Sequence, residues 1–301
     1  MSGVEYDEFG LFHENAHEFG IPFHRPPQVR RQSVEVEPGR SISSLVWGAT
    51  EPQLVFLHGG AQNAHTWDTV ALALDRPLLA VDLPDHGHSD AGRRGPLRLS
   101  ASAGDIALVL RELAPHAAGV IGMSLGGLTA IALGRLAPDL VGRLVLVDVT
   151  PGVNSTKATQ ITDFIDGPAS FSSFDALLER TVAFNPTRTE SSLRRGILHN
   201  AMQQPDGTWI WRYRRFPQEG ERMPEDVAEL WEDISALPAP IMLVRGMLPQ
   251  SVVDDADEAE LRRRRPDARI AHVADAGHSV QGDAPIELAA LIADFVASGS
   301  I

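Results

Sequence analysis

Short stretches made almost wholly of apolar residues recur along the chain, and most are followed by a segment whose apolar side chains repeat every three or four positions. The second spacing is that of one face of a helix. Strands that are apolar throughout are buried on both faces, as in a parallel sheet covered by helices. The pattern therefore predicts an α/β fold. The strand runs are QLVFLHGG, PLLAVDLP, GVIGMSLGG, RLVLVDVTPG, IMLVRG and ARIAHV, and the clearest helical runs are SAGDIALVLREL, GLTAIALGRL and PIELAALIADFV.

Two parts of the chain depart from this alternation. Residues 1–30 contain prolines that discourage a long helix, and we expect an N-terminal arm there. Residues 152–237 hold no strong strand run and are rich in aromatic residues, which predicts a mainly helical cap over the sheet. The core is then formed by residues 31–151 and 238–301. It opens with two short strands near 32–36 and 42–47, joined by a Pro38-Gly39 turn.

The sequence Gly-Met-Ser-Leu-Gly at residues 122–126 lies between an apolar strand run and a helical run. In that context G-x-S-x-G predicts a tight turn that presents Ser124 as a nucleophile. Small residues are needed on either side, because a side chain would clash inside the bend. The backbone N–H of Leu125 would begin the following helix, where the dipole favours a developing oxyanion.

A second glycine-rich turn, His58-Gly59-Gly60, ends an earlier strand run. Glycines there let the backbone approach a substrate, and we expect the N–H of Gly60 to be the second oxyanion donor. Gly59 and Ala61 are predicted to line the same substrate site. His58 is interpreted as a structural residue that supports the loop.

His278, in Ala-Gly-His-Ser after the last strand run, is the predicted general base for Ser124. His86, on a loop after another strand run, is predicted to line the mouth of the site. Trp209 and Trp211 are predicted to form part of the pocket wall over an apolar substrate. Three further histidines lack a strand-end position and are expected at the surface or in the core: His116, His199 and His272.

Taken in order, the segments HGG, DLPDHGHS, GMSLGG and AGHS make the chain resemble the α/β-hydrolases, from about residue 32 to the C-terminus. The resemblance implies an eight-stranded, mostly parallel sheet with a cap inserted after the sixth strand. It also implies a Ser–acid–His chain order, which fits His278 as the last member. A serine at the nucleophile position sets the chain apart from the relatives that use aspartate there.

The acid of the predicted triad is less evident. In the family it usually follows the seventh strand, three residues past a glycine, and here that position is Pro249. Asp254 and Asp255 lie further along the same loop, but they also suit the acidic start of a helix. Asp148 ends an apolar strand at the edge where parallel-sheet active sites gather. We therefore predict Asp148 as the acid, with Asp254 or Asp255 as the alternatives.

Composition narrows the remaining possibilities. The net charge of −14 argues against binding to nucleic acid or to anionic membranes, and the chain has no cysteine for disulfides or thiolate chemistry. Neither a signal peptide nor a membrane span is evident, so a cytoplasmic location is expected. His13-Glu14-Asn15-Ala16-His17 matches H-E-x-x-H, but the flanking Gly10 and Pro22 restrict the helix that a zinc site needs. We expect no metal and no cofactor.

Together these features predict a serine hydrolase that cleaves a small, largely apolar ester, lactone or related acyl compound through an acyl-enzyme on Ser124. Two alternatives stay open. One is a cofactor-free enzyme of the same fold, acting as a C–C hydrolase, lyase or oxygenase, that relies on His278 and Asp148. The other is a non-catalytic protein that binds a small ligand. The expected partner is a small-molecule substrate, and no feature predicts the oligomeric state.

Overall fold

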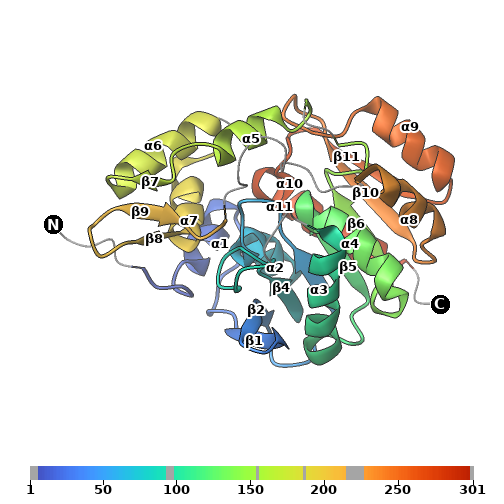
Figure 1. The fold of residues 1–301 in the computed structure, drawn as a ribbon, viewed down its shortest axis with the longest axis horizontal. Helices are drawn as coiled ribbons and strands as arrows, with labels where there is room; N and C mark the ends of the chain where they lie inside the picture. Colours follow the sequence, from blue (N-terminus) through green and yellow to red (C-terminus); the bar gives the residue numbers. More distant parts are fainter. Residues whose placement is uncertain (1–5, 93–97, 154–155, 186–187, 215–226, 299–301) are drawn as a thin grey trace.

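The computed structural model describes residues 6–92, 98–153, 156–185, 188–214 and 227–298, and an eight-stranded sheet lies at its centre (Figure 1). The β1–β2 and β2–β4 pairs are antiparallel, and the other pairs of this sheet are parallel. In sheet order the strands are β1 (Val29–Glu37), β2 (Arg40–Trp47), β4 (Leu78–Val81), β3 (Leu54–Leu57), β5 (Gly119–Met123), β6 (Leu144–Val147), β10 (Ile241–Gly246) and β11 (Arg269–Val273).

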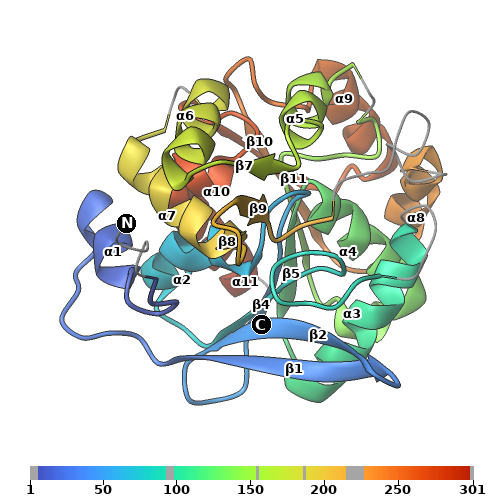
Figure 2. The ribbon, with the colours of Figure 1, turned by 60° about the vertical axis from the view of Figure 1, so that its left-hand side comes forward.

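Both faces of the sheet are buried, which explains why the strand runs are apolar at every position. In β3, Leu54 and Phe56 face one hydrophobic cluster, whereas Val55 and Leu57 face the other. Figure 2 shows the two helical layers on opposite sides of the strands. The first layer contains α1 (Phe12–Glu18), α2 (Asp68–Leu74), α10 (Val280–Asp283) and α11 (Pro285–Ala297), and the second contains α3 (Leu99–Leu113), α4 (Leu125–Leu136), α8 (Leu230–Ala236) and α9 (Asp255–Arg264). Within the described residues, the 3₁₀ helices of the core are η1 (Ala64–Trp67), η2 (Pro138–Leu140) and η3 (Val227–Glu229).

The predicted fold class is therefore confirmed: the sheet has eight strands, is mostly parallel and is covered by helices. The two strands expected near 32–36 and 42–47 are present as the longer strands β1 and β2. Among the described residues, no helix has the length and apolar character needed to cross a lipid bilayer.

A separate group of elements follows β6 and lies at one end of the sheet (Figure 1). We expected a mainly helical cap in this region, but the group also contains a small three-stranded sheet, in the order β7-β9-β8. These strands are two or three residues long, too short for a visible alternation of polar and apolar residues. The elements are α5 (Thr159–Ile165), β7 (Ser170–Phe171), α6 (Phe174–Phe184), α7 (Glu190–Asn200), β8 (Ala201–Gln203) and β9 (Trp209–Trp211).

The last helix of the predicted 152–237 cap belongs to the core layer. Leu230, Trp231 and Ile234 of α8 join the cluster formed by α3 and α4. The cap elements proper, α5 to β9, have their own small hydrophobic cluster, which includes Leu177 and Trp209.

The N-terminal arm packs against the rest of the protein over its described residues. It contains α1, whose Phe12 and Ala16 are four positions apart and so share one buried face. Arg195 of α7 donates to the Asn15 side chain at 2.8 Å and forms an ion pair with Glu18. The arm therefore connects the core with the cap.

Candidate active site

Ser124 lies on the turn between β5 and α4, with backbone angles of φ 49° and ψ −120°. This left-handed conformation is rare for a residue other than glycine, and it persists only where the surrounding structure enforces it. A Cβ atom on Gly122 would lie 2.5 Å from the carbonyl oxygen of Gly126, and one on Gly126 would lie 2.2 Å from that of Leu57. Both glycines are thus required by the close approach of the backbone, as the motif predicts.

His278 lies on the loop after β11, and its Nδ1 is 2.9 Å from Oδ2 of Asp148. An ionised carboxylate can only accept hydrogen bonds, so this contact places the ring proton on Nδ1 and leaves Nε2 as a free base. Both Ser124 and His278 line one cavity of about 500 Å³. That volume is in the range of pockets that enclose small molecules.

Asp148 is fully buried at the end of β6, again with a left-handed backbone angle of φ 47°. Besides His278, it accepts three hydrogen bonds from one stretch of chain that begins at the end of β10. The donors are Gly246 N–H at 2.9 Å, Ser251 Oγ at 2.6 Å and Val252 N–H at 3.1 Å. These bonds offset the cost of burying the charge and fix the orientation of the carboxylate.

The two alternative acids lie elsewhere. Asp254 is the N-cap of α9 and forms a capping box with Asp257. Asp255 is exposed and forms an ion pair with Arg245 at 2.8 Å. Both therefore have the helix-start positions that their sequence context suggested, and neither contacts His278.

The backbone N–H groups near Ser124 differ in whether another group of the protein already accepts a hydrogen bond from them. The N–H of Gly59 donates to Oε1 of Gln62 at 3.2 Å, and the N–H of Ala61 donates to Nε2 of His86 at 3.1 Å. The N–H groups of Gly60 and Leu125 have no hydrogen-bond partner within the part of the chain that the structure describes. Gly59, Gly60 and Ala61 line the cavity, whereas Leu125 is not among its lining residues, so the assignment of Gly60 and Leu125 as oxyanion donors stays a prediction.

Two buried histidines support this loop from behind. His58 Nδ1 is 2.7 Å from the carbonyl oxygen of Gly59, and its Nε2 accepts the N–H of Leu83 at 2.9 Å. His86 makes the equivalent pair of contacts with the Pro84 carbonyl oxygen and the Ala61 N–H. Each ring therefore has to be neutral, with its proton on Nδ1. Burial lowers the pKa of His58 to about 3 and also lowers the pKa of His86, which keeps both rings neutral.

The predicted pocket wall is only partly found at the cavity. Trp211 lines it, together with Phe164 and Phe184 from α5 and α6. Trp209 instead packs against Phe174 inside the cap, with ring centroids 5.2 Å apart. His86 does not line the cavity but lies behind the Ala61 backbone, as described above.

Sequence reasoning missed the charged residues of the cavity, of which Arg188 is one. Arg188 lines it, and among the described residues no carboxylate oxygen lies within 4 Å of its guanidinium. Its Nε has no hydrogen-bond partner there, and burial lowers its pKa. By contrast, the cavity residues Lys157 and Arg195 are neutralised by nearby carboxylates. No sequence pattern marks Arg188, because its position depends on the folding of the cap.

A second group that was missed consists of His65, Asp68 and His199, which also line the cavity and whose ligand-type atoms lie within 4.8 Å of one another. His199 had been expected at the surface or in the core. The H-E-x-x-H histidines lie elsewhere: His13 and His17 are on the exposed face of α1, and His13 Nδ1 is 2.8 Å from the carbonyl oxygen of Gly10.

Comparison with known proteins extends this picture. Residues 54–291 match the model of the alpha/beta hydrolase family. Esterase Rv0045c of Mycobacterium tuberculosis is 47% identical over 295 residues, covering 95% of this chain and 94% of that protein. The sn-1-specific diacylglycerol lipase ABHD11 of Mus musculus is 27% identical over 274 residues, covering 85% of each chain.

Solved structures agree with these matches. A structure of Rv0045c, from work described as transition metal inhibition and structural refinement of that esterase, superimposes with a TM-score of 0.86 at 45% identity, covering 98% of this chain and 100% of the other. The structure of E-2-(acetamidomethylene)succinate hydrolase superimposes with a TM-score of 0.77 at 23% identity, covering 90% and 100%, which shows the shared fold. The chain therefore belongs to the alpha/beta hydrolase family and is a hydrolase.

Proposed function

We propose that this hydrolase is a serine esterase that forms an acyl-enzyme on Ser124. The observation that carries the proposal is the hydrogen bond of 2.9 Å between Asp148 and His278. The His278 imidazole lines the same cavity as Ser124, which lies on a turn with a strained backbone. A nucleophile, a base and an orienting acid are the parts that acyl transfer needs. The 47% identity to a protein named as an esterase supports the same reaction class.

In the proposed reaction, His278 Nε2 takes the Ser124 hydroxyl proton while Oγ attacks the ester carbonyl carbon. The resulting oxyanion accepts hydrogen bonds from the N–H groups of Gly60 and Leu125, each typically contributing about 3 kcal/mol to the barrier reduction. Collapse of the tetrahedral intermediate breaks the bond to the alcohol oxygen, which receives the proton from His278. Water then adds to the acyl group with His278 again as base, and the carboxylic acid leaves.

The cavity supports a small acyl substrate with a substantial apolar part. Phe164, Phe184 and Trp211 form a connected aromatic wall, with the Phe164 ring centroid 5.4 Å from Phe184 and 5.7 Å from Trp211. Arg188 adds a cation that forms no close ion pair among the described residues, with the Asp283 carboxylate of the same cavity acting on it at longer range, and such a cation suits a polar oxygen at one end of the substrate. We therefore propose short-chain or aromatic carboxylic esters and lactones as substrates, rather than a nucleic acid or a membrane surface.

Trapping the acyl-enzyme tests the proposal. The protein is mixed with p-nitrophenyl butyrate, quenched in acid within milliseconds to seconds and measured by intact mass. We expect an adduct of one butyryl group that peptide mapping assigns to Ser124. The Ser124→Ala variant should show neither adduct nor turnover above about one-thousandth of the wild-type rate. Turnover retained in Ser124→Ala would instead favour the cofactor-free chemistry of His278 and Asp148, and ligand binding without turnover would favour a binding protein.

A further inference from the structure

A side chain of the cap holds the loop that carries the predicted oxyanion donor Gly60. Asn200 is the last residue of α7, and its Nδ2 donates to the carbonyl oxygen of Ala61 at 2.7 Å, across 139 positions of the chain. Ala61 follows Gly60 directly, and all three residues line the cavity. The reaction proposed above assigns no role to Asn200.

The backbone of Ala61 is strained. Its φ of 60° lies in the left-handed region, which glycine adopts readily and other residues rarely do. Such a conformation persists only where surrounding contacts enforce it. Two contacts act on Ala61: its N–H donates to His86 Nε2 at 3.1 Å, and its carbonyl oxygen accepts from Asn200. One contact comes from the core and the other from the cap.

The direction of the Gly60 N–H depends on three successive peptide groups of this loop. That N–H shares a planar peptide group with the carbonyl of Gly59, whose oxygen is 2.7 Å from His58 Nδ1, so this contact also constrains the N–H. The next two peptide groups are held by His86 and by Asn200. The part of the loop that follows Gly60 is therefore fixed partly by the cap.

A chain of two amides fixes which end of the Asn200 side chain faces Ala61. A carbonyl oxygen can only accept a hydrogen bond, so the Ala61 carbonyl requires the amide nitrogen of Asn200. Asn200 Oδ1 then accepts from Asn63 Nδ2 at 3.2 Å, and Asn63 Oδ1 accepts the N–H of His65 at 2.9 Å. Reversal of either amide would bring two donors or two acceptors together, so the chain has one stable direction.

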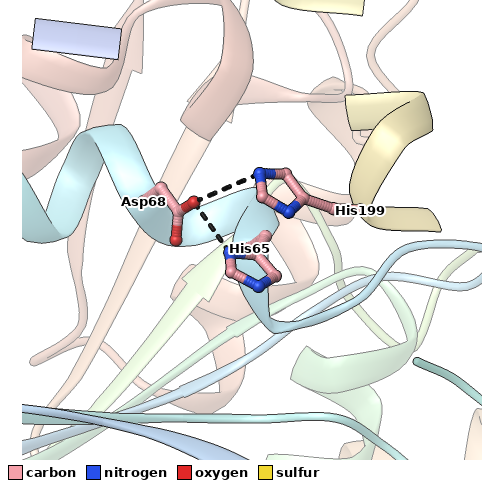
Figure 3. Close-up of side chains that lie close together, drawn as sticks. All are labelled: His65, Asp68 and His199. Carbon is pink, nitrogen blue, oxygen red and sulfur yellow. Dashed lines mark hydrogen bonds and ion pairs between the residues drawn. The ribbon is translucent and has the colours of Figure 1, made fainter. Parts of the chain in front are cut away.

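The end of α7 is attached to the core directly before Asn200. The rings of His199 and His65 stack with centroids 3.8 Å apart at 10°, and both lie beside the Asp68 carboxylate (Figure 3). Asp68 Oδ2 is 2.9 Å from His65 Nδ1 and 3.8 Å from His199 Nε2. Because His65 and Asp68 belong to η1 and α2 of the core, these contacts fix Asn200 relative to the loop after β3.

We propose that Asn200 is a positioning residue for ester hydrolysis, which keeps the Gly60 N–H directed at the oxyanion by holding Ala61 in its left-handed conformation. Both side-chain hydrogen bonds of Asn200 go to the loop, so its effect on the reaction is indirect. The cap thereby takes part in transition-state stabilisation as well as enclosing the substrate. This inference rests on the proposed function, because it takes Gly60 as an oxyanion donor.

The size of the effect follows from the geometry that oxyanion donors need. Loss of one donor typically lowers kcat by about 10²–10³-fold, and donors act only in a narrow geometry. A displaced donor keeps part of its effect, so loss of the Asn200 contact should lower kcat by about 10–100-fold. KM should stay near its wild-type value, because the oxyanion forms only in the transition state and the intermediate.

Steady-state kinetics with p-nitrophenyl butyrate and inhibition by trifluoromethyl butyl ketone test the proposal. The ketone carbon bonds to Ser124 Oγ, its oxygen becomes an oxyanion, and the serine proton passes to His278. Its inhibition constant therefore reports on the oxyanion site without turnover. In Asn200→Leu we expect kcat to fall by about 10–100-fold and KM to change by less than about threefold. The inhibition constant of the ketone should rise in proportion to the loss of kcat/KM.

Asn63→Asp tests the same chain from the core side and serves if Asn200→Leu fails to fold. Its carboxylate still accepts the N–H of His65 but cannot donate to Asn200. The Asn200 amide then reverses and turns its oxygen toward the Ala61 carbonyl. We expect kcat to fall in this variant as well, by about 3–30-fold.

Gln203→Leu is the matched control in the cap. It removes an amide-to-carbonyl hydrogen bond of the same kind, from Gln203 Nε2 to the Gly207 carbonyl oxygen at 3.2 Å, in the exposed β8–β9 hairpin. Both kcat and the inhibition constant of the ketone should stay within about twofold of wild type. A loss as large as that in Asn200→Leu would mean that any damage to the cap slows the enzyme, which contradicts a specific role for Asn200.

Two further results would overturn the proposal. One is a wild-type kcat and ketone inhibition constant in Asn200→Leu or, where that variant does not fold, in Asn63→Asp. The other is a rise in KM that accounts for the whole loss of kcat/KM, because Asn200 would then bind the substrate. Failure of the proposed function is a separate outcome: turnover retained in Ser124→Ala, or no butyryl adduct in the wild type.

Discussion

Asp148 Oδ2 lies 2.9 Å from Nδ1 of His278, although the two residues are 130 positions apart in the chain. The carboxylate comes from the end of β6, and the chain from Gly246 through the loop after β10 surrounds it with donors from Gly246, Ser251 and Val252. That loop has Pro249 where a family member usually carries its acid. It therefore orients a carboxylate from the neighbouring strand in place of supplying one itself.

This arrangement predicts that Asp148→Asn disables the serine. An asparagine side chain can donate to the imidazole and so favour the wrong tautomer. In serine proteases the corresponding substitution lowers kcat by about 10⁴-fold. We expect the rate of acylation by p-nitrophenyl butyrate, measured by stopped flow, to fall by about 10²–10⁴-fold. The Asp254→Asn/Asp255→Asn double variant serves as the control and should stay within a few-fold of wild type. Slowing in the control but not in Asp148→Asn would move the acid to the loop after β10.

The glycines of the two catalytic turns should respond differently to alanine. A Cβ at Gly126 would lie 2.2 Å from the Leu57 carbonyl oxygen, so the backbone has to shift. At Gly60 no atom lies within 4 Å of an added Cβ. We expect Gly126→Ala to reduce the free energy of unfolding by about 1–3 kcal/mol, and Gly60→Ala to reduce it by much less. Urea denaturation measures both, and equal losses would contradict the described turn geometry.

The fold should lose stability in mild acid because of His58. Its folded pKa is about 3, whereas an unfolded chain has the ordinary value near 6.5. Between these values the unfolded state takes up a proton that the folded state does not, so stability is fully present above pH 6.5 and falls as the pH drops toward 3. By pH 5 the protonation of His58 in the unfolded state lowers the free energy of unfolding by about 2 kcal/mol. Urea denaturation at pH 7.5 and pH 5.0 measures how much unfolding free energy the wild type and His58→Asn each lose in acid. The loss should be smaller by about this amount in His58→Asn, and an identical loss in both proteins would refute the assignment.

The N-terminal arm should contribute to stability through α1. Phe12 is 2% exposed and lies 4.9 Å from the Trp47 ring, measured between centroids. Phe12→Ala should reduce the free energy of unfolding by about 3–5 kcal/mol. His17→Ala, on the exposed face of the same helix, is the control and should change it by less than about 0.5 kcal/mol. Similar values for the two variants would mean that the arm is not packed as described.

The sheet and the Ser124 turn could be predicted because their signals are local. Strands buried on both faces are apolar at each position, and the turn requires glycines within a few residues of the serine. The acid was harder to identify, because Asp148 and Asp254 both have a plausible local role and only tertiary packing separates them. Arg188 and His199 leave no local signal, because the folding of the cap, through the α6–α7 connection and α7, brings them to the cavity from distant parts of the chain. The strands of the cap are simply too short to show a period.

The central claim is that Ser124 is an activated nucleophile, and fluorophosphonate labelling followed by intact mass spectrometry tests it most directly. The wild type should gain the mass of one phosphonyl group per chain within minutes, Ser124→Ala should gain none, and His278→Gln should react at least 100-fold more slowly. Absence of labelling in the wild type, or labelling that persists in Ser124→Ala, would contradict the account.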